Sequence, residues 1–137
     1  MKKAIICDID GTLAIRGDRG PFEHEKAQED KVNTHVSNLL SIYKEKDYDI
    51  IIISGRQDRF EELTKNWLLT NSIPFDKLYL RETEDNRKDS ETKKDIYMKY
   101  VKDVYEIEFV LDDRNQVVDM WRKELNLQCF QVNYGDF

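Results

Sequence analysis

Ala4-Ile5-Ile6-Cys7-Asp8-Ile9-Asp10-Gly11-Thr12 is the stretch that decides the fold. A short apolar run, predicted as a strand over residues 3–8, ends where two carboxylates stand one residue apart. Alternation along a strand predicts that Asp8 and Asp10 lie on one side, and Gly11 lets the chain turn sharply after them. Two carboxylates at the end of a buried strand are costly unless something uses them.

The D-x-D-G-T pattern of residues 8–12 is typical of phosphoryl-transfer chemistry. A divalent cation would satisfy the two carboxylates, while one attacks phosphorus and the other handles a proton. An ordinary acidic turn and a calcium loop are the alternatives. A calcium loop needs further acids and a closing Glu, and residues 12–15 lack them.

The bulk composition indicates one globular domain over residues 1–137, with 39% hydrophobic and 36% charged residues. No apolar run approaches the ~20 residues of a membrane helix, and the N-terminus carries too few for a signal peptide. The net charge of −6 argues against a protein that coats nucleic acid, but not against an enzyme that grips one phosphate. No G-x-x-x-x-G-K-[ST] loop occurs.

Apolar runs alternate with helical patterns along the whole chain. This predicts an α/β fold, a single Rossmann-like domain whose parallel sheet of about five strands is covered by helices on both faces. A polar segment over residues 14–30 reads as a minimal cap, and residues 81–92 read as a charged loop. Strands are expected over residues 3–8, 50–53, 78–80, 109–111 and 127–132, and helices over 31–46, 58–71, 93–104 and 115–125. Cys7 and Cys129 fall within strands and read as buried thiols of a protein in a reducing cytoplasm.

Polar groups follow three of these strands, where open parallel sheets bind ligands. They are Asp8 with Asp10, Ser54-Gly55-Arg56, and Asp112-Asp113-Arg114. Asp112 and Asp113 also read as a helix N-cap and a first-turn acid, and residues 54–56 as a simple strand-to-helix turn.

Each group has a chemical interpretation. Asp8 is predicted as the nucleophile that takes the phosphoryl group, and Asp10 as the residue that protonates the leaving oxygen and then activates water. Ser54 would donate a hydroxyl hydrogen bond to the phosphate. Asp8, the backbone carbonyl of Asp10, Asp112 and Asp113 are the expected Mg²⁺ site, with Asp113 the direct ligand and Asp112 in support.

These motifs resemble the haloacid dehalogenase superfamily of phosphotransferases. Its four marks stand in order as Asp8 to Thr12, Ser54, Lys88, and Asp112-Asp113. The match is closer to the 3′-phosphatase domain of phage polynucleotide kinase. It includes residues 18–21, Ser54 to Arg56, residues 81–89, residues 112–118, and Gly135-Asp136-Phe137.

The resemblance implies further roles. Arg19 and Arg56 are implied to engage the substrate phosphate. Asp85 and Lys88 are implied to organise the third motif, with Lys88 bridging the nucleophile and the phosphate. The family's best-known members carry an N-terminal kinase domain. Here Met1 is followed at once by the strand, which favours a free-standing or trimmed phosphatase domain.

The implied activity is a Mg²⁺-dependent polynucleotide 3′-phosphatase. A short cap leaves a site open to the end of a polymer. Nucleic-acid 3′ ends, DNA or RNA, are the expected partners, with a kinase or ligase beside them and, if the chain is phage-encoded, the host cytoplasm as the location. A nucleotidase or small-molecule phosphatase on the same scaffold, and a non-catalytic module that binds phosphorylated ends, are the alternatives.

Overall fold

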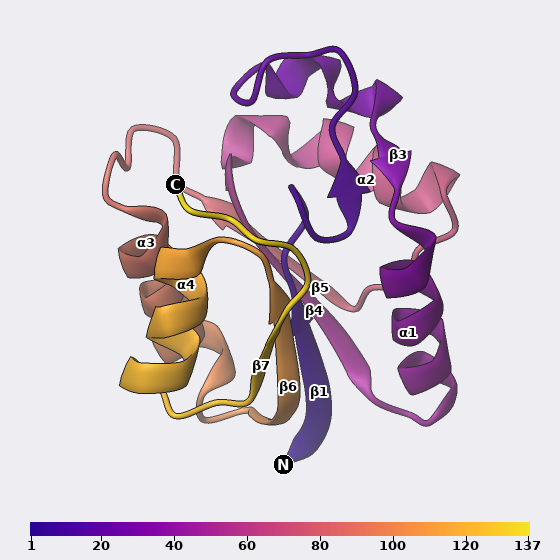
Figure 1. Cartoon of the computed structure of the whole chain (residues 1–137). Helices are drawn as coiled ribbons and strands as arrows, with labels where there is room; N and C mark the ends of the chain where they lie inside the picture. The colour runs from indigo at the N-terminus through magenta and orange to yellow at the C-terminus, as the bar shows by residue number, and fades with distance from the viewer.

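The five apolar runs pair side by side into one parallel sheet in a computed structural model that describes all of residues 1–137 (Figure 1). The strand order is β5-β4-β1-β6-β7, so β1 lies in the centre. Every neighbouring pair runs parallel, and the carboxyl ends of all five strands therefore meet at one edge. The strands are β1 (Lys2–Cys7), β4 (Asp49–Gln57), β5 (Lys77–Arg81), β6 (Tyr105–Asp112) and β7 (Cys129–Gln131).

Helices cover both faces of this sheet, as expected. The helices are α1 (Thr34–Glu45), α2 (Glu61–Thr70) with the 3-10 turn η2 (Asp58–Phe60) before it, α3 (Asp89–Ile96) continued by the π-helical turn η3 (Tyr97–Val101), and α4 (Asn115–Asp119) continued by the π-helical turn η4 (Met120–Glu124). In Figure 1, α3 and α4 lie on one side of the sheet and α1 on the other. None of the helices is long and apolar enough to cross a membrane.

The isoleucine run of β4 shows why the sheet needs two covering layers. Ile50 and Ile52 belong to the cluster that packs with α1 and α2, whereas Ile51 and Ile53 belong to the cluster on the α3 and α4 side. Successive side chains of a strand point to opposite faces, so a continuous apolar run is stable only when both faces are covered. Cys7 and Cys129 are free thiols within β1 and β7, and both are buried, as expected.

Several element boundaries differ from the sequence-based expectation. β4 does not stop at Ser54 but continues to Gln57 through a register shift against β5, so Ser54 and Arg56 lie within the strand. The expected helix over 93–104 begins four residues earlier, at Asp89, and Tyr100 and Val104 are exposed rather than inward-facing. Pairing with a neighbouring strand and packing decide these ends, and neither is visible in local periodicity.

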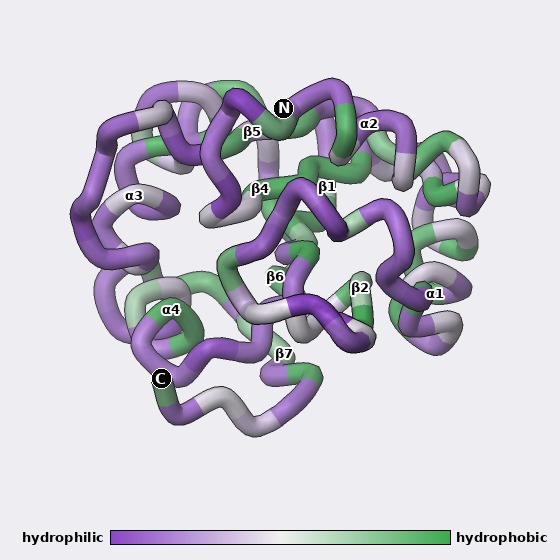
Figure 2. The backbone as a smooth tube through the Cα atoms, turned by 90° about the horizontal axis from the view of Figure 1, so that it is seen from above, coloured by the Kyte–Doolittle hydropathy of each residue, from purple (hydrophilic) through white to green (hydrophobic).

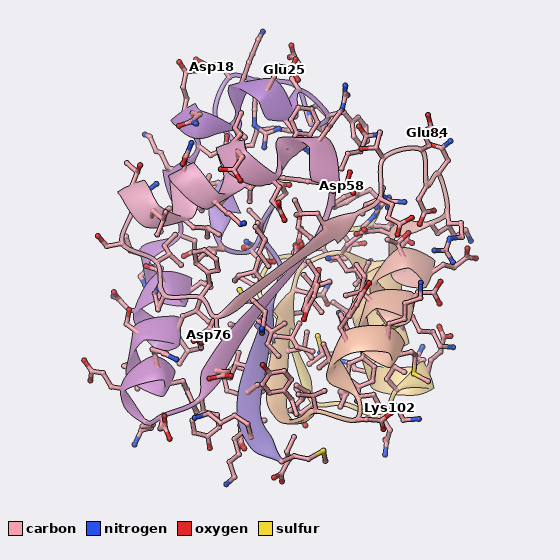
Figure 3. All side chains as sticks on the ribbon, turned by 180° about the vertical axis from the view of Figure 1, so that it is seen from behind. Asp18, Glu25, Asp58, Asp76, Glu84 and Lys102 are labelled. Carbon is pink, nitrogen blue, oxygen red and sulfur yellow. The ribbon has the colours of Figure 1, made fainter.

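The polar segment over residues 14–30 forms a small cap beyond the carboxyl ends of the strands. Short strand β2 (Ala14–Ile15) pairs antiparallel with β3 (Lys31–Val32), and the 3-10 helix η1 (His24–Glu29) lies between them in sequence. Asp18 and Glu25 lie at the outer end of this cap, while Asp76 and Lys102 lie toward the opposite end of the sheet (Figure 3). Seen from above, hydrophilic loops surround the apolar strands (Figure 2). The cap therefore sits over the edge of the sheet that carries the predicted site.

Candidate active site

The carboxylate of Asp8 lies at the centre of a buried charge cluster. β1 ends at Cys7, so strand alternation does not place Asp8 and Asp10 on one side as expected; the turn after the strand places them separately. Lys93 Nζ donates hydrogen bonds to Asp8 Oδ1 at 2.8 Å and to Asp112 Oδ2 at 3.0 Å. Only 1% of the lysine side chain is exposed. Asp8 follows β1 directly, Lys93 belongs to α3, and Asp112 is the last residue of β6.

The lysine beside Asp8 is therefore Lys93 and not Lys88. Lys88 is exposed and stands just before α3, and Asp85 pairs with Arg87 on the exposed loop rather than with a lysine. A run of charged residues does not show which lysine faces inward, so the expectation that Lys88 contacts the nucleophile is wrong. Lys93 lies three and four positions before the buried Ile96 and Tyr97. That helical spacing was the available signal for an inward-facing lysine.

Asp8, Asp112 and Asp113 converge as predicted, with one carboxylate oxygen of each within 4.8 Å of the others. Asp112 accepts three hydrogen bonds from the protein: Lys93 and Trp121 Nε1 donate to its Oδ2, and the backbone N–H of Asp113 donates to its Oδ1. Asp113 accepts one hydrogen bond, from Thr12 Oγ1 at 3.2 Å. Asp113 thus has more free lone pairs for a cation than Asp112 has.

The charges of this cluster do not balance. Burial, then the neighbouring charge of Asp112, raises the pKa of Asp8, and burial likewise raises the pKa of Asp113. Burial works against the ammonium of Lys93, but the charges of Asp112 and Asp8 outweigh it and raise the pKa of the lysine. One lysine faces three buried carboxylates, so a divalent cation fits the remaining negative charge and the all-oxygen donor set.

Asp10 lies on the cap side and is held by both predicted arginines. Arg56 donates to both carboxylate oxygens, at 2.9 Å and 2.8 Å, and Arg19 Nη2 donates to Oδ1 at 2.9 Å. The side chain is 35% exposed, so it remains open to a ligand. Burial alone would raise the pKa of Asp10, but the hydrogen bond and charge of Arg56, with the charges of His24 and Arg19, hold it below its ordinary value.

Asp30 is a site residue that sequence reasoning missed. Its carboxylate accepts two hydrogen bonds from Arg19, at 2.9 Å and 2.8 Å, and Oδ2 lies 3.5 Å from Arg56 Nη2. Its backbone carbonyl accepts from Trp67 Nε1 on α2 at 2.9 Å. Asp30 therefore anchors both arginines to the body of the domain. It is one of several acids in a polar segment, and no motif in the sequence marks it.

Two glycines let the loops approach one another. Gly11 has φ +84°, and a Cβ on it would lie 2.1 Å from Asp113 Oδ2. A Cβ on Gly55 would lie 2.2 Å from Asp89 Oδ1. Ser54 is buried, and its hydroxyl oxygen accepts from the Arg56 N–H at 3.2 Å, which leaves its proton available to another acceptor.

Of the predicted site residues, the structure brings most together at the carboxyl edge of the sheet. Asp8, Asp112 and Asp113 form one group, and Asp10, Arg19 and Arg56 the adjoining one. Ser54 lies beside this second group through the backbone of Arg56. Asp85 and Lys88 belong to neither group: the carboxylate of Asp85 pairs with Arg87 on the loop before α3, and Lys88 is exposed.

Comparison with known proteins agrees with this geometry. A family model for the polynucleotide kinase PNKP phosphatase domain matches residues 2–137. The "Putative bifunctional polynucleotide kinase/RNA ligase" of Autographa californica nuclear polyhedrosis virus is 33% identical over 126 residues, 88% of this chain and 18% of that protein.

Two solved structures share the whole fold. A chain in "Structure of Pnkp1/Rnl/Hen1 complex" is 47% identical with a TM-score of 0.97, over 100% of this chain and 48% of that one. A chain in "Structure of the Pnkp1/Rnl/Hen1 RNA repair complex" is also 47% identical with a TM-score of 0.97, over 99% of this chain and 44% of that one. The chain thus spans less than half the length of each of these relatives. The resemblance to haloacid dehalogenase phosphatases is confirmed, and the chain belongs to the polynucleotide kinase PNKP phosphatase domain family.

Proposed function

We propose that this domain is a Mg²⁺-dependent phosphomonoesterase that removes the 3′-phosphate from nucleic-acid ends through an aspartyl-phosphate. The observation that carries the proposal is the arrangement around the DxD motif. Asp8 lies among buried acids with one lysine, and the neighbouring Asp10 is held by two arginines at the open, cap-side edge. The acids and the basic groups of a phosphotransferase thus lie side by side.

Asp8 is the proposed nucleophile. Its oxygen forms a bond to phosphorus as the bond from phosphorus to the 3′ oxygen breaks, and water later releases inorganic phosphate and restores the carboxylate. Lys93 donates to Asp8 Oδ1 at 2.8 Å. This contact fixes the direction of the carboxylate, and the charge of Lys93 offsets part of the rise in pKa that burial and the charge of Asp112 cause at Asp8.

Asp10 is the proposed acid and base. It donates a proton to the leaving 3′ oxygen and then takes one from the attacking water. In this structure Arg19 and Arg56 hold Asp10 as a carboxylate. A bound phosphate competes for the same N–H donors, and their withdrawal from Asp10 raises its pKa toward the protonated form that the first step needs. Substrate binding and proton loading are coupled in this proposal.

Asp8, Asp113 and the backbone carbonyl of Asp10 are the groups that would hold Mg²⁺, with Asp112 positioned through Lys93 and Trp121. When bound, the cation supplies positive charge to the phosphoryl oxygens. The Thr12 hydroxyl, 3.2 Å from Asp113 and 3.3 Å from Asp8, orients both carboxylates.

The substrate assignment rests on the family and on the short cap. The cap consists of one two-stranded ribbon and one 3-10 helix, which leaves room for a polymer end. The name of one relative joins a polynucleotide kinase to an RNA ligase, and one of the similar solved structures is that of an RNA repair complex. We therefore propose that the domain works beside a 5′-kinase or a ligase, and that its substrates include RNA ends.

A substrate panel tests this function. The chain is incubated with Mg²⁺ and matched RNA or DNA oligonucleotides carrying phosphate at the 3′ or the 5′ end, beside a 3′-mononucleotide. We expect the 3′-phosphorylated oligonucleotides to release phosphate fastest. Asp8→Asn should abolish release, whereas Asp119→Asn, the same change at an exposed position on α4, should not. Preference for the mononucleotide supports a nucleotidase, and binding of 3′-phosphorylated ends without turnover supports an end-binding module.

A further inference from the structure

The last residues of the chain lie against both loops that carry the acids. The tail, defined here as residues 132–137, follows β7 and runs over the carboxyl edge of the sheet beside α4, drawn yellow in Figure 1. Its first contact is with the DxD loop, which is the segment Asp8 to Thr12. The side-chain amide of Asn133 donates to the carbonyl of Gly11 in this loop at 2.8 Å. The tail thus holds the turn directly after Asp10.

The tail and the end of β7 also hold the Asp112-Asp113 loop. Gln131 Nε2 donates to the carbonyl of Asp113 at 2.9 Å, and the backbone N–H of Asn115 donates to the carbonyl of Gly135 at 2.7 Å. A Cβ on Gly135 would lie 2.5 Å from the backbone oxygen of Asp113. Only a glycine lets the tail lie this close to the loop.

A further pair of contacts fastens the far end of the tail. Arg114, the residue after the acid pair, donates from Nε to the carbonyl of Phe137 at 2.8 Å. Its guanidinium also stacks over the Phe137 ring, 4.7 Å from the ring centroid. These contacts cross from the loop to the tail at a second point, so the tail is fixed on both sides of Gly135.

The two loops need such a connection because their own charges push them apart. Asp8 and Asp113 face each other across the buried cluster, with one carboxylate oxygen of each within 4.8 Å of the other, and two negative charges at this separation repel. Two hydrogen bonds already connect the two segments. The backbone N–H of Asp8 donates to the carbonyl of Leu111 at 3.0 Å, and the Thr12 hydroxyl donates to the Asp113 carboxylate at 3.2 Å. Asn133 of the tail and Gln131 at the end of β7 add contacts to the carbonyls of Gly11 and Asp113, outside the repelling carboxylates.

We infer that the tail is a strap that sets the separation of the two acid-bearing loops and thereby tunes the affinity of the site for a divalent cation. Asn133 is its main positioning residue on the DxD side. The inference rests on the metal site of the proposed function. The Asn133 and Gln131 amides fix two backbone carbonyls, and Gly135 allows the close approach that brings them into reach.

The test measures cation binding without substrate. Mn²⁺, a hard cation that suits the same oxygen ligands, is titrated into the full chain, and free Mn²⁺ is read by electron paramagnetic resonance. We expect Asn133→Ala to raise the Kd for Mn²⁺ by about 2- to 10-fold, the loss of one hydrogen bond. Its Tm in chelator should stay close to that of the wild type, because the contact lies at the exposed surface. Asn133→Gln, which keeps the amide donor, should recover part of the affinity.

Matched changes separate the strap from a general effect. Asn38→Ala makes the same substitution on the exposed side of α1, and Tyr134→Ala removes a neighbouring tail side chain that is 81% exposed. Neither should change the Kd. Gly135→Ala, which pushes the tail from Asp113, should weaken binding more than Asn133→Ala.

The outcomes are distinguishable. If the wild-type chain binds no Mn²⁺, the proposed metal site itself fails. If it binds Mn²⁺ and Asn133→Ala binds equally well, or if Asn38→Ala weakens binding as much, the strap is overturned. A fall in Tm in chelator with an unchanged Kd also overturns it, since the contact then serves stability alone. A raised Kd at an unchanged Tm supports it.

Discussion

Individual side chains divide the site into two charge systems with different needs. Around Asp8, three buried carboxylates share one lysine, so negative charge is in excess. Around Asp10, two arginines and the anchoring Asp30 give a balanced set of hydrogen-bonded ions. The first system favours a cation, and the second presents guanidinium donors to an anion. A phosphomonoester with its metal would contact both.

Lys93 and Lys88 give a direct comparison at this scale. Lys93→Met removes the buried ammonium at nearly the same size, so we expect phosphatase activity to fall on the order of 100-fold or more. It should also lower the free energy of unfolding, because Asp8 and Asp112 lose their partner. Lys88→Met, at an exposed position, should change activity by less than about 2-fold. Steady-state kinetics and thermal melts measure both; equal effects of the two changes would contradict the assignment of Lys93.

Asp30 gives a second residue-scale prediction. Asp30→Asn keeps the shape of the side chain but removes the charge that holds Arg19 and lies near Arg56. With the arginines less well oriented, we expect kcat/KM to fall on the order of 100-fold. Binding of Mn²⁺ should be unchanged, because Asp30 lies outside the acid cluster. Asp119→Asn serves as the matched control, and wild-type activity in Asp30→Asn would show that the arginines need no anchor.

At the scale of elements, the ends of strands and the starts of helices position the functional side chains. β1 ends before Asp8, and Asp10 lies in the turn that follows, next to Gly11, where its side chain meets Arg19 of the cap. α3 begins at Asp89 and places Lys93 one turn later, on the face that packs toward β1 and β6. β4 extends through its register shift to carry Arg56 to Asp10. The functional groups therefore lie at or just beyond the ends of these elements, where the chain changes direction.

The turn at Gly11 can be tested by adding one methyl group. Gly11→Ala places a Cβ 2.1 Å from Asp113 Oδ2 at a backbone φ of +84°, where L residues are strained. We expect a loss of activity on the order of 100-fold and a lower Tm. Gly17→Ala in the cap, whose Cβ would meet nothing within 4 Å, should leave both unchanged. Similar activity of the two variants would contradict the close packing of the two acid loops.

For the whole molecule, the site is a source of instability that the rest of the fold offsets. Two apolar clusters of 14 buried residues each, one on either face of the sheet, hold the strands in place. At the edge of that core stand like charges that repel one another. Function and stability therefore oppose each other at Asp8, as is common at catalytic sites.

The pH dependence of stability follows from the raised pKa values of Asp8 and Asp113. The folded protein holds these protons to higher pH than the unfolded chain does. Their contribution to stability is fully present below the unfolded-state pKa, about 4, and is lost as the pH rises through the raised folded-state pKa. Asp8→Asn removes one of the repelling charges. We expect it to raise the Tm in chelator, by about 3 °C or more, with a larger gain at about pH 8 than at about pH 5.

Thermal melts of wild type and Asp8→Asn, with chelator or with Mg²⁺, measure this effect. Mg²⁺ should stabilise the wild type more than Asp8→Asn, because the variant lacks one ligand charge. Asp119→Asn controls for the loss of a carboxylate elsewhere. A lower Tm of Asp8→Asn in chelator would mean that the pair with Lys93 stabilises the fold more than repulsion destabilises it.

The sequence by itself determined the parallel α/β fold, the alternation of strands and helices, and the site at the carboxyl edge of the sheet. Continuous apolar strands such as Ile50–Ile53 must be buried on both faces, and acids directly after such strands stand at one edge. Asp8, Asp10 and the Asp112-Asp113 pair were therefore recognisable from residue type and position alone.

The tertiary structure alone decided which charged residues from the polar segments enter the site. Lys93 rather than Lys88 meets Asp8 because the start of α3 sets the helical phase, and Asp30 matters because the cap folds back onto Arg19 and Arg56. The contact of Asn133 with Gly11 joins residues at opposite ends of the chain. Local sequence carries no record of such pairs, since a charged or amide side chain is equally compatible with solvent until packing brings it a partner.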